Sequence, residues 1–322
     1  MSACLIFGGS GYIGTHMAQY LLQHNIFTTI YIADIKPSSL AGNPNIIFYF
    51  ADVRKPLSKA PIHHPIDWIF NIAAIHREPG HSDHEYFDTN VNGAKNVCYF
   101  AQIIGCNNIF FTSSISPYGP TAHATTENDM LCPNTPYGVS KMQAEYIHRL
   151  WQCAGVPAKR LIIARPGVIY GPGDPGNILR MITAIKKGYF FLPGSGQIRK
   201  SYGYIYGLCA SVVFTMKQDK PTVIYNYVEK YTENLTSMIQ IIKEVTGSRA
   251  ITWHIPMPIL IAISKILHAV YPGIKGIHPV RVRKVARPTH IVPQYLIDSG
   301  FVFEYDFKTS LVHWRSVSPQ DF

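Results

Sequence analysis

The 322-residue sequence lacks a disulfide pattern, a long charge run and an internal repeat. Its six cysteines are scattered with no C-x-x-C pair, which predicts reduced, mostly buried thiols and a cytoplasmic protein. The first residues show no basic start followed by a long apolar segment and a small-residue cleavage site, so no secretory signal is predicted. Only 15% of the residues are charged and 47% are hydrophobic, so the chain has enough apolar material for a large core.

The longest apolar stretch, from Ile255 to Tyr271, is interrupted by two prolines, a lysine and a histidine. It is too short and too broken to cross a bilayer, which takes roughly 20 apolar residues, so no stable membrane insertion is predicted. The favoured interpretation is a buried or half-buried helix. A helix lying in a membrane interface is the alternative.

The formal net charge of +10 comes from 29 basic and 19 acidic residues. A basic chain invites a nucleic-acid partner, but these cations are dispersed and line no helix, so no nucleic acid is predicted. Four cations cluster near the C-terminus, namely Arg281, Arg283, Lys284 and Arg287. They form either a solvated face or a site for an anionic substrate, and a small polyanion fits them better than a duplex.

Strand-like and helix-like segments alternate through the first half of the chain. Strands are predicted over 3–7, 28–33, 46–50, 68–72, 109–112 and 160–164, and helices over 13–24, 85–104 and 136–153. This alternation predicts an α/β fold with a Rossmann-like, doubly wound parallel sheet. The pattern then loosens, with helices over 177–187 and 234–246 and strands over 202–205 and 222–226. We therefore expect one domain over 1–165, to which some later segments return, and a smaller C-terminal lobe over 166–322.

A glycine-rich turn follows the first strand and opens the first helix. Gly8, Gly11 and Gly14 are each three residues apart, so backbone N–H groups can approach a pyrophosphate at the helix N-terminus. Asp34 falls twenty residues after Gly14, at the end of the second strand. An acid there accepts hydrogen bonds from ribose hydroxyls and repels a 2′-phosphate, which favours NAD over NADP. Lys36 weakens that preference, because a cation accommodates the extra phosphate.

Tyr137 and Lys141 lie four residues apart at the start of a predicted helix and share one face. A neighbouring ammonium favours the phenolate, which makes the tyrosine usable as an acid or base near neutral pH. A serine-rich strand end that includes Ser114 precedes them by some two dozen residues. Together with the dinucleotide turn, this set predicts hydride transfer to or from a substrate alcohol or ketone.

These features resemble the extended short-chain dehydrogenase/reductases, and within them the nucleotide-sugar epimerases and dehydratases. The resemblance is dense over 4–172 and thin thereafter. The motifs that carry it are the glycine turn, Asp52-Val53, Asn71-Ile72-Ala73-Ala74, Thr89-Asn90-Val91-Asn92-Gly93, Ser113-Ser114-Ile115-Ser116-Pro117-Tyr118-Gly119, Pro136-Tyr137-Gly138-Val139-Ser140-Lys141 and Arg165-Pro166-Gly167-Val168-Ile169-Tyr170-Gly171-Pro172.

The resemblance implies a role for each of these residues. Tyr137 would be the acid/base, Lys141 would lower its pKa and bind the nicotinamide ribose, and Ser114 would hydrogen-bond the reacting sugar oxygen. The NAD site would comprise Gly8, Gly11, Tyr12, Ile13, Gly14, Asp34, Asp52, Val53, Ala73, Asn90, Tyr137, Lys141, Pro166 and Val168. Members of the family commonly form homodimers through the two helices expected over 85–104 and 136–153.

Departures from the family pattern narrow the chemistry. The 4,6-dehydratase branch carries an Asp-Glu pair directly after the catalytic hydroxyl residue, where this chain has Ile115 and Ser116, so water elimination is disfavoured. Lys200 stands where the family has an arginine, and keeps the cation but loses its bidentate geometry. Val168 replaces the asparagine of many relatives. The details of substrate binding therefore differ from the family pattern.

The candidate substrate residues are the least constrained by the sequence. They are Ser114, His76, Asn177, Lys200, Arg281 and Arg287. Asn177 would either present a helix N-terminus to a substrate phosphate or act as a simple N-cap. The loop histidines His76, His81 and His84 lack a tight ligand pattern, so no metal is predicted.

The leading hypothesis is an NAD-dependent nucleotide-sugar epimerase, acting at C4 through transient oxidation to a keto-sugar and return of the hydride. The first alternative is an NAD(P)H-dependent 4-keto-sugar reductase of surface-polysaccharide synthesis. The apolar 255–271 stretch suggests a dehydrogenase of apolar alcohols similar to the 3β-hydroxysteroid branch, and a non-catalytic dinucleotide sensor is a further alternative.

Overall fold

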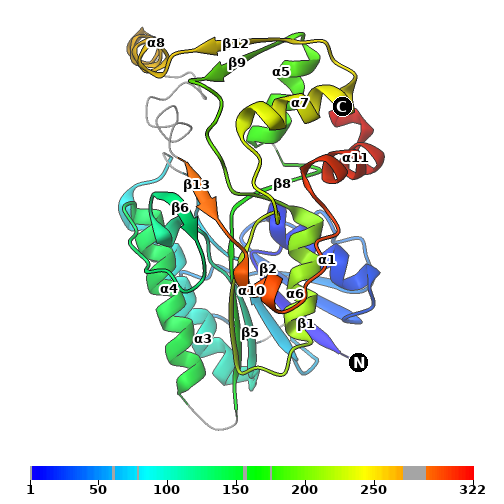
Figure 1. The fold of residues 1–322 in the computed structure, drawn as a ribbon. Helices are drawn as coiled ribbons and strands as arrows, with labels where there is room; N and C mark the ends of the chain where they lie inside the picture. Colours follow the sequence, from blue (N-terminus) through cyan, green and yellow to red (C-terminus); the bar gives the residue numbers. More distant parts are fainter. Residues whose placement is uncertain (1, 60–61, 78–79, 155–157, 175, 271–287) are drawn as a thin grey trace.

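Seven parallel strands form the central sheet of the computed structural model, which describes residues 2–59, 62–77, 80–154, 158–174, 176–270 and 288–322 (Figure 1). The strand order is β11-β7-β5-β4-β1-β2-β3. The strands are β1 (Ala3–Phe7), β2 (Thr29–Asp34), β3 (Ile46–Phe50), β4 (Trp68–Asn71), β5 (Asn108–Thr112), β7 (Arg160–Pro166) and β11 (Thr222–Tyr227). The order reverses between β1 and β4, and such a switch point opens a ligand crevice at the carboxyl ends of the strands. The doubly wound α/β fold is confirmed.

The strands form because their side chains are apolar on both faces. In β1, Leu5 packs into the core on one side of the sheet and Ile6 into the core on the other, and neither is exposed. Continuous apolar runs of this kind are typical of parallel strands covered by helices on both sides. The helices α1 (Tyr12–Gln23) and α6 (Ile205–Met216) pack together, and α3 (Gly93–Ile104) packs on α4 (Pro136–Cys153).

The helix expected over 85–104 is three segments, namely α2 (Asp83–Tyr86), the π-helix η1 (Phe87–Asn92) and α3. A capping box between Ser82 and Glu85 starts α2 two residues earlier than expected. Asn90 lies in the π-helical turn and is 3% exposed. Its amide bonds the backbone of Ile75 in both directions and donates to Ser140 Oγ at 2.9 Å. Turns of this kind are frequent at functional sites.

A second lobe extends the molecule at one end (Figure 1). It contains α5 (Asn177–Lys186), β9 (Tyr189–Pro193), α7 (Leu235–Thr246), β12 (Ile251–Ile255), α8 (Met257–Val270) and α11 (Phe307–Val317). One buried cluster runs from Ile6 and Met17 of the sheet layer to Ile178 and Leu235 of this lobe, so the two parts share a core. Since α6 and β11 lie with the large sheet, segments beyond residue 166 do return to it. The division at 165/166 itself stays a proposal.

The remaining elements are short. They are β6 (Thr121–Thr125), β8 (Val168–Tyr170), β10 (Tyr202–Tyr204), β13 (Thr289–Ile291), α10 (Gln294–Asp298) and the 3-10 turns η2 (Ser116–Tyr118) and η3 (Pro319–Asp321). Among the described residues, β10 pairs with β8, β12 with β9 and β13 with β6, each as a two-stranded parallel sheet. All six cysteines are free, and all but Cys132 and Cys153 are buried, in line with the expected reduced thiols.

The expected apolar helix is α8, and its cover is incomplete. Ile259 is 52% and Ile263 42% exposed, whereas Ser264 of the same helix is buried. This burial pattern fits the half-buried form of the favoured interpretation and not the fully buried one. Among the described residues, none of the helices combines the length and apolarity that a bilayer crossing requires.

Candidate active site

The glycine turn between β1 and α1 is closed tightly around its own backbone. Gly8 has a φ of +77°, and a Cβ added there would meet the backbone nitrogen of Ala73 at 2.6 Å. A Cβ at Gly14 would meet Gly8 O at 2.4 Å. Gly11 is the N-cap of α1 and supplies no side-chain cap, so the first N–H groups of the helix are left for a ligand. These residues fit the pyrophosphate of a dinucleotide.

Asp34 lies at the end of β2 with its carboxylate fixed beside this turn. The backbone N–H of Ser10 donates to Oδ2 at 3.1 Å, and that of Lys36 donates to Oδ1 at 3.1 Å. Ser10 Oγ donates to the Lys36 carbonyl at 2.8 Å, which ties the end of β2 to the glycine turn. A fixed, half-buried carboxylate in this place suits a ribose diol and disfavours a 2′-phosphate.

Asp52 and Val53 follow β3 on the same side of the sheet. Arg54 donates two hydrogen bonds to Asp52 through Nε and a third through Nη2 at 2.7 Å, and these bonds hold the pKa of Asp52 below its usual value. Val53 is 8% exposed and packs against α3 so closely that a Cβ at Gly93 would come within 2.9 Å of it. The loop is thereby held next to the helix.

The start of α4 positions Tyr137 and Lys141. Thr135 caps the helix by accepting from Gly138 N at 3.1 Å, with Pro136 in the first turn. Tyr137 is half-buried, with its ring centre 6.2 Å from that of Tyr86.

Lys141 is 1% exposed, and its Nζ lies 4.5 Å from the centre of the Phe111 ring. Burial lowers the pKa of Lys141 to about 7. A desolvated cation one turn below a tyrosine favours the phenolate.

Two neighbouring serines that follow β5 have different hydrogen-bond partners. Ser114 Oγ accepts from the backbone N–H of Ser116 at 3.1 Å and donates to Ser116 Oγ at 3.2 Å, which fixes the loop toward α4. Ser113 Oγ instead donates to Glu145 at 2.5 Å inside the protein. Ser113 Oγ is therefore committed to the protein interior, whereas the hydrogen bonds given for Ser114 Oγ lie within its own loop.

A buried ion pair that we did not predict supports this arrangement. Arg165 donates to Glu145 through Nε at 2.9 Å and Nη2 at 2.7 Å, and both side chains are almost fully buried. Arg165 also donates to Tyr118 OH at 2.8 Å, and that hydroxyl donates to Asn226 at 2.9 Å. The network joins α4 to β7 and β11 at the edge of the site. The only signal in the sequence is that Glu145 lies one helical turn after Lys141.

Comparison with known proteins agrees with this geometry. A sequence model described as the NAD dependent epimerase/dehydratase family matches residues 4–227. The chain belongs to the NAD dependent epimerase/dehydratase family. The expectation of an NAD-dependent enzyme of the extended short-chain dehydrogenase/reductase type is therefore confirmed.

Individual members of this epimerase/dehydratase family differ in how much of the chain they cover. N-acetyl-alpha-D-glucosaminyl-diphospho-ditrans,octacis-undecaprenol 4-epimerase of Escherichia coli O157:H7 is 28% identical over 319 residues, covering 95% of this chain and 92% of its own. UDP-glucose 4-epimerase 2 of Oryza sativa subsp. japonica is 32% identical over 161 residues, covering 45% of this chain and 39% of its own. The crystal structure of UDP-glucuronic acid 4-epimerase from Bacillus cereus with NAD superimposes with a TM-score of 0.77 at 18% identity and covers 99% of both chains.

Most predicted cofactor residues gather at the carboxyl edge of the sheet. The glycine turn and Asp34 lie at the ends of β1 and β2, Ala73 follows β4, and Pro166 ends β7. Tyr12 and Ile13 open α1. The Tyr12 hydroxyl is buried without a hydrogen-bond partner among the described residues, and its ring packs on His16 at 4.8 Å. The Asn90 amide bonds Ile75 and Ser140, so it holds the loop after β4 to α4.

The predicted substrate residues are less well gathered. His76 is exposed in the loop after β4. Val168 of β8 is 44% exposed and pairs with Tyr202 of β10, two residues after Lys200, so Lys200 and Val168 lie near one another. Asn177 is the first residue of α5 and its N-cap is Gly176, so the N-cap interpretation of Asn177 is wrong. Arg281 and Arg287 lie outside the described residues.

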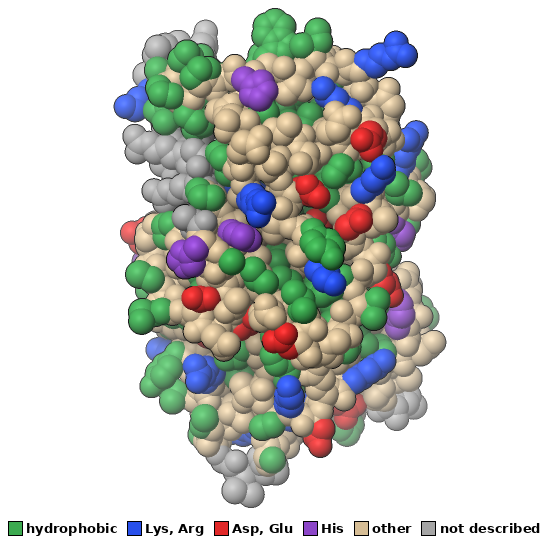
Figure 2. Space-filling model, viewed as in Figure 1, with side chains coloured by type: hydrophobic (Ala, Val, Ile, Leu, Met, Phe, Trp, Pro, Cys, Tyr) green, Lys and Arg blue, Asp and Glu red, His purple; other side chains and the backbone are tan. Residues whose placement is uncertain are grey.

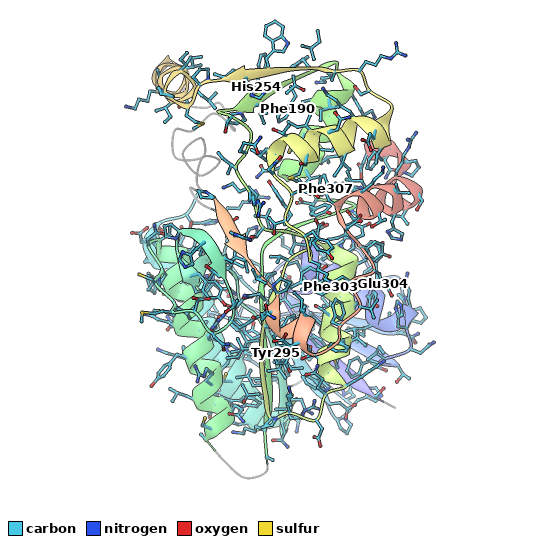
Figure 3. All side chains as sticks on the ribbon, in the orientation of Figure 1. Phe190, His254, Tyr295, Phe303, Glu304 and Phe307 are labelled. Carbon is cyan, nitrogen blue, oxygen red and sulfur yellow. The ribbon has the colours of Figure 1, made fainter. Side chains whose placement is uncertain are left out.

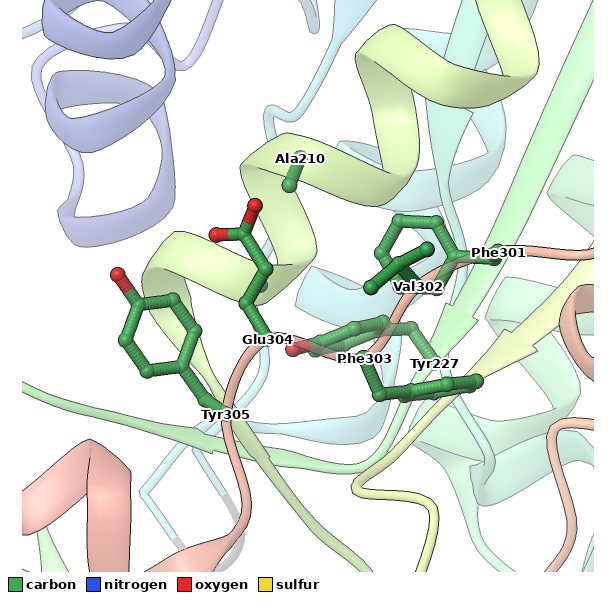
Figure 4. Close-up of a pocket in the computed structure, with 8 residues that line it drawn as sticks. Ala210, Tyr227, Phe301, Val302, Phe303, Glu304 and Tyr305 are labelled. Atoms are coloured by element: carbon green, nitrogen blue, oxygen red, sulfur yellow. The ribbon is translucent and has the colours of Figure 1, made fainter.

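One small hollow has no part in this site. Ala210, Tyr227 and the aromatic side chains of the segment Phe301 to Tyr305 surround it (Figure 4). Its volume is about 10 Å³, about the space of one water molecule. It is a packing gap and cannot hold a substrate.

Proposed function

We propose that this enzyme inverts C4 of a sugar that is carried on a diphosphate, with NAD retained in the site. The observation that supports the proposal is that Tyr137 and the buried Lys141 lie one turn apart at the start of α4. The loop that carries Ser114 packs on this part of the helix, because a Cβ at Gly138 would come within 2.8 Å of Ser116 O. Together these residues supply an acid/base, a cation one turn away and a hydrogen-bond donor. The proposal explains why all three residues are present next to a dinucleotide turn.

The chemistry assigned to the chain is proton transfer and orientation. Ser114 holds the C4 oxygen, Tyr137 takes its proton, and Lys141 stabilises the resulting charge and binds the ribose hydroxyls. When bound, NAD would supply a hydride acceptor, and no external oxidant would be consumed because the hydride would return to the sugar. Inversion requires the keto-sugar to present the opposite face of C4 for that return, and Tyr137 gives the proton back to the oxygen.

The serine loop argues against elimination of water. Ile115 and Ser116 occupy the positions of the acidic pair of 4,6-dehydratases, and Ser116 is engaged in hydrogen bonds with Ser114. Neither side chain is an acid or a base. An epimerase needs nothing at these positions beyond a fixed loop.

The group that carries the sugar is a diphosphate ester, and two carriers have this chemistry. The Oryza relative is named for a nucleoside diphosphate sugar, and the Escherichia relative, which matches along nearly the whole chain, is named for a polyprenol diphosphate sugar. Lys200, near Val168 and the site, and Asn177, at the start of α5, are proposed to meet the diphosphate. Parallel assays with a panel of UDP-hexoses and with polyprenol-linked N-acetylhexosamines separate the carriers.

The predicted homodimer has support on the surface of α3 and α4. Tyr99 and Ile103 are 66% and 48% exposed on α3, and Tyr146 and Leu150 are 62% and 51% exposed on α4. Each pair is four residues apart, so the two helices present an apolar stripe. We propose that two copies meet along these helices. We also propose that the protein acts in the cytoplasm.

The decisive experiment combines cofactor identification with one variant. The purified protein is denatured, and the released nucleotide is identified by mass spectrometry, where stoichiometric NAD is expected. Tyr137→Phe should lower turnover by at least about a hundredfold, whereas Tyr146→Phe on the same helix should leave it unchanged. An empty protein that consumes added NADH or NADPH would instead establish the ketoreductase, and normal turnover by Tyr137→Phe would refute the mechanism.

A further inference from the structure

The two-stranded sheet of the second lobe exposes an aromatic face. β9 and β12 pair so that Tyr189 lies beside Ile251 and Phe191 beside Trp253. These four side chains are 47%, 63%, 51% and 57% exposed, in that order. The Phe191 and Trp253 rings meet edge to face at 6.2 Å. Because side chains alternate along a strand, the intervening Phe190 turns inward and packs on the core (Figure 3).

This aromatic face continues into α8. Pro256 links β12 to the helix, and the exposed Ile259 and Ile263 lie one turn apart. Figure 1 places β9, β12 and α8 together at the end of the molecule farthest from the large sheet, and Figure 2 shows exposed hydrophobic side chains there. Isolated exposed apolar residues need no explanation, but six of them, three aromatic, on two paired strands and the helix that follows indicate a binding surface.

The two segments that carry the aromatic face contain cations and no acid. Residues 176–200 contain five lysines or arginines and no acid, and residues 245–265 contain Arg249 and Lys265 and no acid. An open groove of about 330 Å³ runs between α5 and the start of β9, beside Tyr189. Its lining includes Arg180 and Lys187 over apolar side chains. A groove with this lining suits a phosphate headgroup and the upper part of an acyl chain.

The charge decides which partner fits. A second copy of this chain would bring the same cations against each other, whereas an anionic surface would neutralise them. Aromatic side chains with flanking lysines and arginines are enriched at the level of lipid headgroups. We propose that this end of the second lobe binds the surface of an anionic lipid bilayer without crossing it. The role of this membrane-binding surface rests on the proposed function: it would hold the active site beside a sugar that is linked to a polyprenol in the bilayer.

The test uses the full chain and sucrose-loaded vesicles of phosphatidylcholine, with or without phosphatidylglycerol. We expect the protein to sediment with the anionic vesicles and to be released by high salt. The pair Phe191→Ser and Trp253→Ser should weaken binding by about tenfold or more, because it removes two large apolar side chains from the interface. Phe50 and Val302 lie outside this face and are more exposed, at 70% and 73%, so Phe50→Ser with Val302→Ser is the control pair and should leave binding unchanged.

A second pair of variants tests the charge. Lys187→Gln should weaken binding to anionic vesicles, and Lys217→Gln, exposed at the end of α6, should leave it unchanged. Failure to bind, or equal binding by the aromatic double variant, would overturn the inference. The inference would also be overturned if sedimentation velocity showed the wild-type chain to self-associate and the Phe191→Ser, Trp253→Ser double variant not to. Tyr137→Phe should bind vesicles as the wild type does, so a failure of the proposed chemistry is read separately from a failure of the membrane surface.

Discussion

Removal of one member of the buried pair between Glu145 and Arg165 tests how the site is held. Their side chains are 4% and 6% exposed, and two hydrogen bonds of 2.7 and 2.9 Å join them. Glu145→Leu leaves the guanidinium buried without its counter-charge and Ser113 Oγ without its acceptor. Breaking such a pair costs about 3 to 5 kcal/mol. We therefore expect Glu145→Leu to lower the free energy of unfolding by that amount.

The assay is urea unfolding followed by circular dichroism, on the single variants and on the double variant with Arg165→Met. The double variant removes both charges and fills the space with apolar groups of similar size. It should lose less than either single variant, because no unpaired charge remains. Tyr118 OH still has Asn226 as its acceptor.

Activity gives a second readout. The carboxylate of Glu145 raises the pKa of Lys141, against the larger effect of burial. Loss of that charge should therefore lower the pKa of Lys141 further and move the pH profile of turnover. A loss below about 1 kcal/mol in Glu145→Leu, or a double variant that costs the sum of the singles, would refute the argument.

Two further predictions concern the cofactor turn and the buried lysine. Gly14→Ala should abolish NAD retention, because its Cβ would lie 2.4 Å from Gly8 O, and mass spectrometry of the denatured protein measures this. Lys141→Met should be more stable than the wild type at pH 7. Because burial lowers the pKa of Lys141 to about 7, the unfolded chain holds the extra proton above that pH, so wild-type stability should rise toward pH 10. The advantage of Lys141→Met should therefore shrink by about 1.4 kcal/mol per pH unit, and an advantage that is constant from pH 7 to 10 would contradict the stated pKa.

The part of the fold nearest the cofactor could be predicted because its signals are local. The run Ala3–Phe7 is buried on both faces, and the glycines that follow are needed by the turn they make. The break in the helix over 85–104 had no such signal. It depends on Asn90 reaching Ile75 and Ser140, which come from other parts of the chain.

In the second lobe the helices over 177–187 and 234–246 could be predicted from local signals, but the strand pairing could not. β9 and β12 are each other's partners across about sixty residues. The run Tyr189 to Leu192 has the appearance of a buried segment, because the sequence alone does not tell which of its alternate side chains meets the core. Only the pairing shows that Tyr189 and Phe191 point outward while Leu192 is buried.

The helix α4 shows how a catalytic cation is kept at the edge of a hydrophobic core. Its inner face carries Lys141, Glu145 and His148, each less than 4% exposed, at positions where a helix usually presents apolar residues. The network of Arg165 neutralises Glu145. His148 stacks on Phe111 at 4.1 Å and bonds Asn71 at 3.2 Å, and burial lowers its pKa to about 4, so it adds no charge near neutral pH. Lys141, one turn after Tyr137, is thus the group of these three that titrates near pH 7, because burial lowers its pKa to about 7 against the opposing effect of Glu145.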